Sequence, residues 1–150
     1  ERTMNETQTT IVGEVDVPHE GPQAVKLGNE LGGGTVEFGN TQMGIEGYFI
    51  QTGTTQRIPF SLKRMTAPDP KNIFREIRQN AKKVQRAAGE SGSGIVLGEG
   101  ANTIIFLELE NVTVQQIVDF VAANKPNIFP ETGIFRMIII EGSDGVRITY

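Results

Sequence analysis

Residues 35–65 read TVEFGNTQMGIEGYFIQTGTTQRIPFSLKRM. Three segments of this stretch are rich in the β-branched and aromatic residues that favour strands: Thr35–Phe38, Gly44–Ile50 and Arg57–Met65. Gly39-Asn40 and Gly53-Thr54 separate the segments, and both pairs favour turns. The stretch therefore predicts a β-meander of three consecutive strands.

A helix is predicted on each side of the meander. The first begins at Pro22, because proline suits the first helical position, and ends at the glycines from Gly32. The second begins at Pro68-Asp69-Pro70 and continues to about Ala88. Its apolar residues are spaced so that one face of the helix lies against the core: Ile73, Phe74, Ile77, Ala81, Val84 and Ala88.

The rest of the chain continues to alternate. Thr103–Leu109 is a predicted buried strand, and Thr113–Asn124 is a predicted amphipathic helix with Thr113 as its N-cap. Arg136–Glu141 and Val146–Tyr150 form a predicted hairpin. We therefore expect an α/β (α+β) fold, a mixed sheet flanked by helices in the order αβββαβ, followed by a C-terminal helix and hairpin.

Length and composition limit the class of protein. A chain of 150 residues suits one domain, so we expect residues 21–150 to form it and residues 1–20 to be a linker or an added edge strand. The absence of Cys and the single His exclude disulfides, thiolate zinc sites and multi-His metal sites. The sequence has no apolar run near the roughly 20 residues that span a bilayer. It also lacks a secretory signal, so an exported form would carry that signal on a larger precursor.

The charge is distributed unevenly. Nine of the 14 Lys and Arg residues lie between Arg57 and Arg86, where only Asp69 and Glu76 oppose them, giving a local balance of +7. The remaining residues carry −11. A concentrated positive surface binds polyanions, so we interpret this region as a nucleic-acid surface. The predicted contacts are Arg64, Lys71, Arg75, Arg78, Lys82, Lys83 and Arg86.

Two charged residues of the meander suit phosphodiester cleavage. Glu46 lies in the middle strand, and Lys63 lies in the third strand on the same face as Ser61, because side chains alternate along a strand. Cleavage needs a carboxylate to hold a divalent ion, and a cation to stabilise negative charge in the transition state. Glu46 and Lys63 supply one of each.

The blocks GIEGYFI at residues 44–50 and IPFSLK at residues 58–63, followed by the basic helix, resemble the PD-(D/E)XK nuclease superfamily. Within it they are similar to the C-terminal toxin domains of bacterial contact-dependent growth inhibition and related polymorphic toxins. The resemblance covers roughly residues 22–109. It implies a restriction-endonuclease-like fold and metal-dependent cleavage of nucleic acid, often transfer RNA, with Mg²⁺ as the expected ion. It also implies a cognate immunity protein, which should be acidic, and secretion within a larger bacterial protein that acts in the target-cell cytoplasm.

The resemblance assigns Glu46 to the acidic position of the middle strand and Lys63 to the lysine position. Ser61 stands where the motif expects an acid, and a serine there is able to hydrogen-bond a phosphate instead. Glu30 in the first helix and Glu37 in the first strand are the candidates for the missing acid, Glu37 with Glu46 as metal ligands. The alternatives are structural: Glu37 and Glu46 as solvent-facing strand residues, and Glu30 as a charge at a helix end.

Three function classes follow. The first is a nuclease toxin domain centred on Glu46 and Lys63. The second is a non-catalytic module that binds nucleic acid or protein through the basic helix at residues 71–86. In the third, the acidic remainder of the chain docks a basic partner, and the basic helix is internal support.

Overall fold

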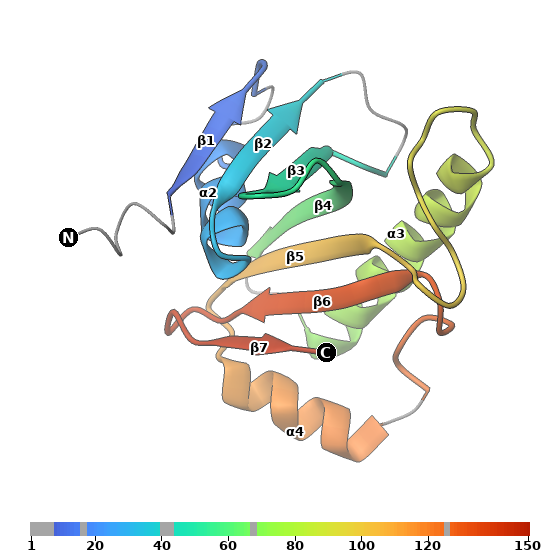
Figure 1. Cartoon of the computed structure of the whole chain (residues 1–150). Helices are drawn as coiled ribbons and strands as arrows, with labels where there is room; N and C mark the ends of the chain where they lie inside the picture. The colour runs from blue at the N-terminus through green and yellow to red at the C-terminus, as the bar shows by residue number, and fades with distance from the viewer. Residues whose placement is uncertain (1–7, 16–17, 40–43, 67–68, 125–126) are drawn as a thin grey trace.

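The computed structural model describes residues 8–15, 18–39, 44–66, 69–124 and 127–150 (Figure 1). These residues form one seven-stranded sheet whose strands lie in chain order from β1 to β7. β3 and β7 run antiparallel to their neighbours, and the remaining adjacent pairs are parallel. The strands are β1 (Thr9–Val12), β2 (Gly34–Phe38), β3 (Gly47–Gln51), β4 (Arg57–Thr66), β5 (Thr103–Glu110), β6 (Phe135–Glu141) and β7 (Arg147–Thr149).

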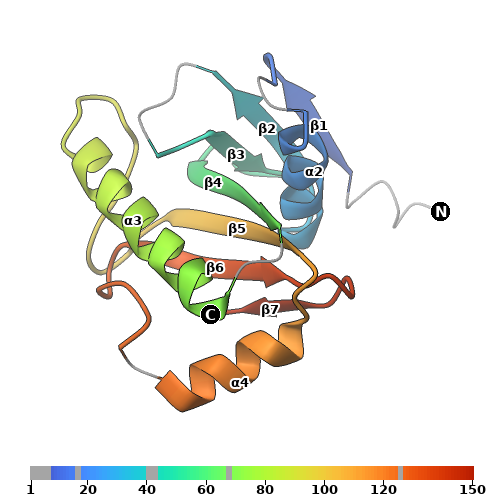
Figure 2. The same cartoon turned by 180° about the vertical axis from the view of Figure 1, so that it is seen from behind.

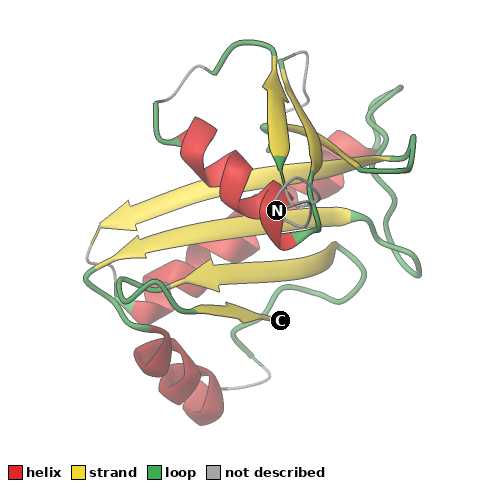
Figure 3. Cartoon of the chain, turned by 60° about the vertical axis from the view of Figure 1, so that its left-hand side comes forward, coloured by secondary structure: helices red, strands yellow, loops and turns green. Residues whose placement is uncertain are grey.

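Three helices cover the two faces of the sheet. α2 (Glu20–Glu30) packs on one face, and α3 (Pro70–Ala88) and α4 (Val114–Asn124) pack on the other. Figure 3 shows α2 in front of the long strands and α3 behind them, and Figure 2 shows α3 from its own side. Alternate side chains of β5 supply both cores: Ile104 and Phe106 contact the α2 layer, and Ile105 and Leu107 contact the layer of α3 and α4.

The mixed α/β class is confirmed, and the differences from the predicted boundaries are small. α2 begins at Glu20 rather than Pro22. The middle strand begins at Gly47 rather than Gly44, because Gly44 has φ of 91°, outside the strand region. Residues 9–12 form an edge strand parallel to β2, which is one of the two alternatives for the first 20 residues; residues 1–7 lie outside the described residues.

α3 connects β4 to β5, and α4 connects β5 to β6. Both helices begin with the residues that their sequences predict. α3 starts with Pro70 at its first position, and its buried stripe differs from the predicted one in two ways: Ala87 replaces Ala88, and Asn80 is also buried. Before α4, the Thr113 N–H donates to the Gln116 side chain at 2.8 Å, and the Gln116 N–H donates to the Thr113 hydroxyl at 3.4 Å. This reciprocal pair is a capping box. None of the helices in the described ranges is long and apolar enough to cross a membrane.

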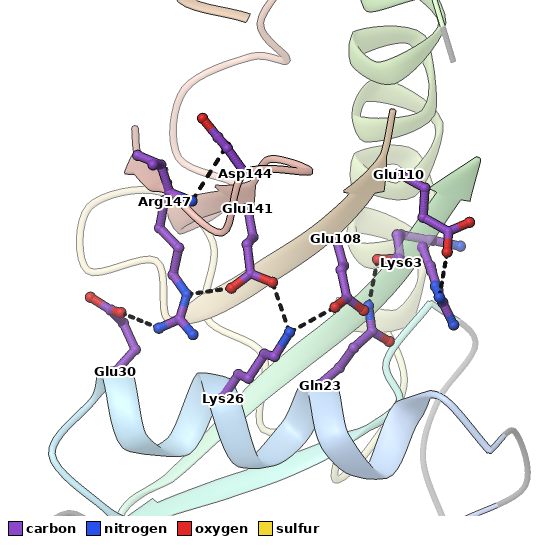
Figure 4. A network of polar contacts seen from close by, with 11 residues as sticks. Gln23, Lys26, Glu30, Lys63, Glu108, Glu110, Glu141, Asp144 and Arg147 are labelled. Atoms are coloured by element: carbon purple, nitrogen blue, oxygen red, sulfur yellow. Dashed lines mark hydrogen bonds and ion pairs between the residues drawn. The ribbon is translucent and has the colours of Figure 1, made fainter. Parts of the chain in front are cut away.

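A charged network joins α2 to the last strands (Figure 4). Lys26 lies 2.7 Å from the carboxylate of Glu108 and 2.8 Å from that of Glu141, and Arg147 pairs with Glu141 at 2.8 Å and with Glu30 at 2.7 Å. Burial alone would raise the pKa of Glu141, but hydrogen bonds from Lys26 and Arg147 lower it. The network therefore keeps a buried carboxylate ionised beneath α2.

Lys26→Met is expected to destabilise the protein by about 1–2 kcal/mol, because Glu141 loses one of its two cationic partners and Glu108 loses its own. Urea unfolding at neutral pH measures the change. Arg64→Met is the matched control: its pair with Glu110 at 2.5 Å is exposed, and its loss should cost much less. Equal losses in the two variants would contradict a structural role for the network.

Candidate active site

Glu46 lies directly before β3 and not within the strand as predicted, and it still bonds to β4. Its N–H donates to the Phe60 carbonyl at 2.9 Å, and its carboxylate accepts the N–H of Leu62. The N–H groups of a strand point along the sheet toward the neighbouring strand, so the carboxyl lies near the plane of the sheet. It is therefore on neither face alone, and it lies next to the residue that precedes Lys63.

Ser61 positions the segment that carries Glu46. The Ser61 hydroxyl is fully buried and donates to the carbonyl of Gly44. A Cβ at Gly44 would lie 2.8 Å from the Cβ of Lys83 on α3, so only glycine fits this approach. The serine is thus engaged inside the protein, and its hydroxyl is not presented to a phosphate at the surface.

Burial raises the pKa of Glu46 to about 7, from an ordinary value of 4.5. The hydrogen bond from Leu62 and the positive charges of Lys63 and Lys83 lower the pKa, while the nearby charge of Glu20 raises it. Burial dominates this balance. Near neutral pH the carboxyl is consequently divided between its charged and neutral forms.

Lys63 extends from β4 toward α3. Its ammonium lies 3.5 Å from the carboxylate of Glu76, and its side chain retains 25% exposure. From the other layer, the fully buried Gln23 of α2 donates to the backbone carbonyl of Lys63 at 2.7 Å. Lys63 is therefore held from both layers while its ammonium remains open to solvent.

One side of α3 completes this cluster. Glu76, Asn80 and Lys83 are spaced by four and then three residues, so they lie along one side of the helix. Asn80 is only 1% exposed, and neither polar atom of its side chain has a hydrogen-bond partner among the described residues. A buried amide without partners costs stability and is uncommon in native proteins. Asn80 is therefore a buried polar group beside Glu76 and Lys83 whose amide is not used by the described residues.

Asn80→Leu is expected to stabilise the protein by about 1–3 kcal/mol, because it replaces an unpartnered buried amide with an apolar group of similar size. Urea unfolding at constant pH measures the change. Gln79→Leu is the control, because Gln79 directly precedes Asn80 in α3 and is exposed. It should change stability by less than about 0.5 kcal/mol. Destabilisation by Asn80→Leu would mean that the amide contributes to folding.

Glu30 and Glu37, the two candidates for the missing acid, each pair with an arginine. The Glu30 carboxylate lies 2.7 Å from Arg147 within the network under α2, and the Glu37 carboxylate lies 3.0 Å from Arg57. Neither has a contact with Glu46 or Lys63 among the described interactions. The structure brings together Glu46, Ser61 and Lys63, with Glu76 as the second carboxylate beside Lys63.

The predicted basic residues divide into three groups. Four lie on the exposed side of α3: Lys71, Arg75, Lys82 and Arg86. Arg78 and Lys83 lie at its edges, where Arg78 donates to the Ile128 carbonyl at 2.6 Å. Arg64 pairs with Glu110 at 2.5 Å. Hydrogen bonds from Thr66 and Arg64 lower the pKa of Glu110, so the charge of Arg64 is balanced locally.

Sequence reasoning missed Glu76, Asn80 and Gln23. A signal for Glu76 was present, because it is one of only two acids in the basic segment and precedes Asn80 by one helical turn. Asn80 interrupts the apolar stripe of α3 at a position that packing alone would fill with an apolar residue. Gln23 carried no such signal, since its contact depends on a residue 40 positions away.

Two carboxylates and one amide are a sparse set for a metal ion. Within the described ranges, no group of three or more His, Asp or Glu side chains is arranged to hold one. Mg²⁺, however, is commonly bound by one or two protein carboxylates, with water and phosphate oxygens completing the shell. Glu46 is one such carboxylate, but the charges that act on its pKa are those of Lys63, Glu20 and Lys83, whereas Glu76 contacts Lys63. The described residues therefore do not assemble a Mg²⁺ site by themselves.

Comparisons with protein-family models, with curated proteins and with solved structures found no match for this chain. Its function therefore has to be argued from the site.

Proposed function

We propose that this chain is a nuclease domain that cleaves phosphodiester bonds, with RNA as the preferred substrate and Glu46 and Lys63 at the reacting centre. One observation carries the proposal: a carboxyl whose burial raises its pKa to about 7 lies beside a solvent-accessible lysine, next to a helix with a basic outer side. Perturbed carboxyls next to specific charges are typical of active sites.

The residues have separate roles in this proposal. Glu46 accepts the proton of the attacking hydroxyl or water, a task for which a pKa near the working pH is best. Lys63 stabilises the negative charge that develops on the phosphoryl oxygens. Glu76 and Gln23 hold the lysine, and Ser61 holds the segment that carries Glu46.

Mg²⁺ is the proposed cofactor on the strength of the resemblance alone, and Glu46, which accepts the proton, is not counted among its ligands. When bound, such an ion polarises a phosphoryl oxygen and neutralises part of its charge. The chain order α2, β2, β3, β4, α3, β5 supports the same proposal, because it is the αβββαβ order of the restriction-endonuclease-like fold. Glu46 precedes the middle strand of that set, and Lys63 lies on the next strand.

The biological setting is proposed from the resemblance. A toxin domain of this kind is released within a larger exported bacterial protein, acts on transfer RNA in the cytoplasm of a target cell, and is blocked by an immunity protein. The exposed lysines and arginines of α3 make an acidic inhibitor the complementary partner, since opposite charges speed encounter and exclude wrong partners.

The test is incubation of the purified protein with total RNA and, separately, with plasmid DNA, in Mg²⁺ or in EDTA. We expect RNA to be cut in Mg²⁺ and spared in EDTA. Intact RNA under both conditions would contradict the proposal, and cutting that persists in EDTA would remove the metal from it.

A second candidate is a module that binds nucleic acid without cutting it. It is favoured by the small number of acids at the site, two carboxylates beside Lys63 rather than a set of three. Such a module keeps its affinity for RNA in EDTA and leaves the RNA intact.

Arg75→Ala combined with Arg86→Ala is expected to weaken RNA binding and to reduce the salt dependence of binding. Each phosphate contact to single-stranded RNA contributes about 0.7 to the slope of log affinity against log salt, so the slope should fall by roughly 1.4. Titrations in EDTA at several salt concentrations measure it. An unchanged slope would place the RNA away from α3 and would favour the reading in which the acidic surface docks a basic partner.

A further inference from the structure

A hollow of about 490 Å³ opens beside the C-terminal end of β7, on the sheet face that carries α3. Its walls are apolar and largely aromatic, formed by Phe129, Phe135, Ile138 and Tyr150. The rings of Phe129 and Tyr150 lie 5.1 Å apart between their centroids. The volume is within the range of about 300–1,000 Å³ typical of small-molecule sites.

A second hollow, of about 220 Å³, connects this one to the basic side of α3. It is lined by Arg78, Lys82 and Gln85 of the helix, and it shares Phe129, Pro130 and Glu131 with the first hollow. Phe129 is fixed from behind, because its ring meets the buried ring of Phe74 edge-on with 5.4 Å between centroids. Two cationic side chains of α3 and the carboxylate of Glu131 therefore lie next to an aromatic wall.

Two polar residues also line the aromatic hollow. Arg136 is exposed and offers guanidinium donors, and Glu131 is exposed and offers a carboxylate acceptor. An aromatic, apolar hollow with a donor and an acceptor in its lining suits a nucleobase, which has stacking faces and a polar edge. The neighbouring Arg78 and Lys82 suit the phosphates that accompany such a base.

We propose that this hollow binds one unpaired base of a single-stranded RNA whose phosphates lie along α3. The identity of the ligand rests on the proposed function, because the RNA that is cut is the RNA that is bound. A base inside a duplex cannot enter the hollow, so the proposal assigns the substrate to single-stranded loops or ends.

The hollow and Glu46 lie on opposite sides of α3, so a base bound in the hollow sets which phosphodiester bond reaches Glu46. Glu76 and Lys83 lie on the side of α3 that faces Glu46, and Arg78 and Gln85 lie on the opposite side, roughly half a turn around the helix. A helix with its side chains is about 10–12 Å wide. The bound base is thus separated from the reacting phosphate by the width of α3, and cleavage occurs a few nucleotides from an unpaired base.

The test measures binding without cleavage, in EDTA, with a fluorescent 2′-O-methyl RNA of about eight nucleotides. Each position is made abasic in turn. We expect loss of the base at one position to weaken binding about 5- to 150-fold, the effect of removing one stacked base, and the other positions to matter much less. Because the protein is unchanged in this series, folding does not affect the result.

Tyr150→Ala should weaken binding of the intact probe by a similar factor. In this variant the abasic position should have almost no further effect on affinity, because the base and the Tyr150 ring form the same contact. Tyr150→Phe keeps the stacking ring and should retain affinity. Val146→Ala, at an exposed position of the last hairpin, is the control. Uniformly small abasic effects, or a Tyr150→Ala loss that is equal for intact and abasic probes, would overturn the proposal.

The outcomes separate this inference from the proposed function. If every abasic position weakens binding equally, and the salt dependence of binding falls in the Arg75→Ala and Arg86→Ala variant, the base site is rejected and the RNA-binding surface on α3 is retained. If one abasic position of the probe weakens binding and the protein never cuts RNA, the base site is retained and the nuclease activity is rejected.

Discussion

Glu46→Gln is expected to lower the rate of RNA cleavage by about 10²–10⁴-fold while making the protein more stable above neutral pH. The amide can still accept the N–H of Leu62, so the segment that carries it should remain in place. It cannot take a proton from the attacking group. Glu99→Gln, in an exposed loop, is the control and should cut RNA as the unmodified chain does.

The stability effect follows from the pKa of Glu46. Burial raises this pKa to about 7 from 4.5, so the folded protein binds the proton more tightly than the unfolded chain does. The stabilising contribution of this group is complete below pH 4.5 and is lost as the pH rises through 7. The difference between the two pKa values corresponds to at most about 3 kcal/mol.

Urea unfolding in EDTA at about pH 5 and about pH 8 measures this effect. Glu46→Gln lacks the titration, so it should exceed the unmodified protein in stability at the higher pH by up to about 3 kcal/mol and by much less at the lower pH. A variant that cuts RNA normally would end the catalytic role of Glu46. A stability difference that is independent of pH would instead mean that the carboxyl is not buried as described.

Lys63→Met is expected to lower cleavage by about 10²–10³-fold, the usual loss when one stabilising group is removed from developing negative charge. It should also change the pH dependence. The charge of Lys63 lowers the pKa of Glu46, so without it that pKa rises and the acidic limb of the cleavage profile moves to higher pH.

Rates at saturating RNA over a range of pH measure both effects of Lys63→Met. Arg57→Met removes a positive charge from the same strand, where Arg57 pairs with Glu37, and should leave the rate and the pH profile unchanged. A lower rate with an unshifted profile would mean that Lys63 acts on the substrate alone and does not reach Glu46.

Most of the fold was predictable because its signals are local. Alternating β-branched and aromatic residues, glycine turns and the apolar stripe from Ile73 to Val84 each report on a few neighbouring positions. The capping box at Thr113 is similarly contained within four residues. Boundary differences, such as the start of β3 at Gly47, occur where a tertiary approach sets the backbone, here the packing of Gly44 against Lys83.

The site was predictable only in part. Glu46 and Lys63 could be paired from the order of the strands, and the basic side of α3 could be listed from its spacing. The role of Ser61 could not, because a hydroxyl that faces a loop carbonyl and one that faces a phosphate have the same sequence. Glu30 and Glu37 were plausible acids until their arginine partners on β7 and β4 were known.

By itself the sequence determined which segments become strands and helices, the placement of positive charge on α3, and the placement of Lys63 on the strand that follows the segment of Glu46. Only the tertiary structure decided which second acid accompanies Lys63, that Asn80 is buried without partners, and that an aromatic hollow lies beside the basic helix. The physical reason is range. Backbone propensity and periodicity act over a few residues, whereas burial, ion pairing and pKa depend on groups that packing brings together from distant parts of the chain.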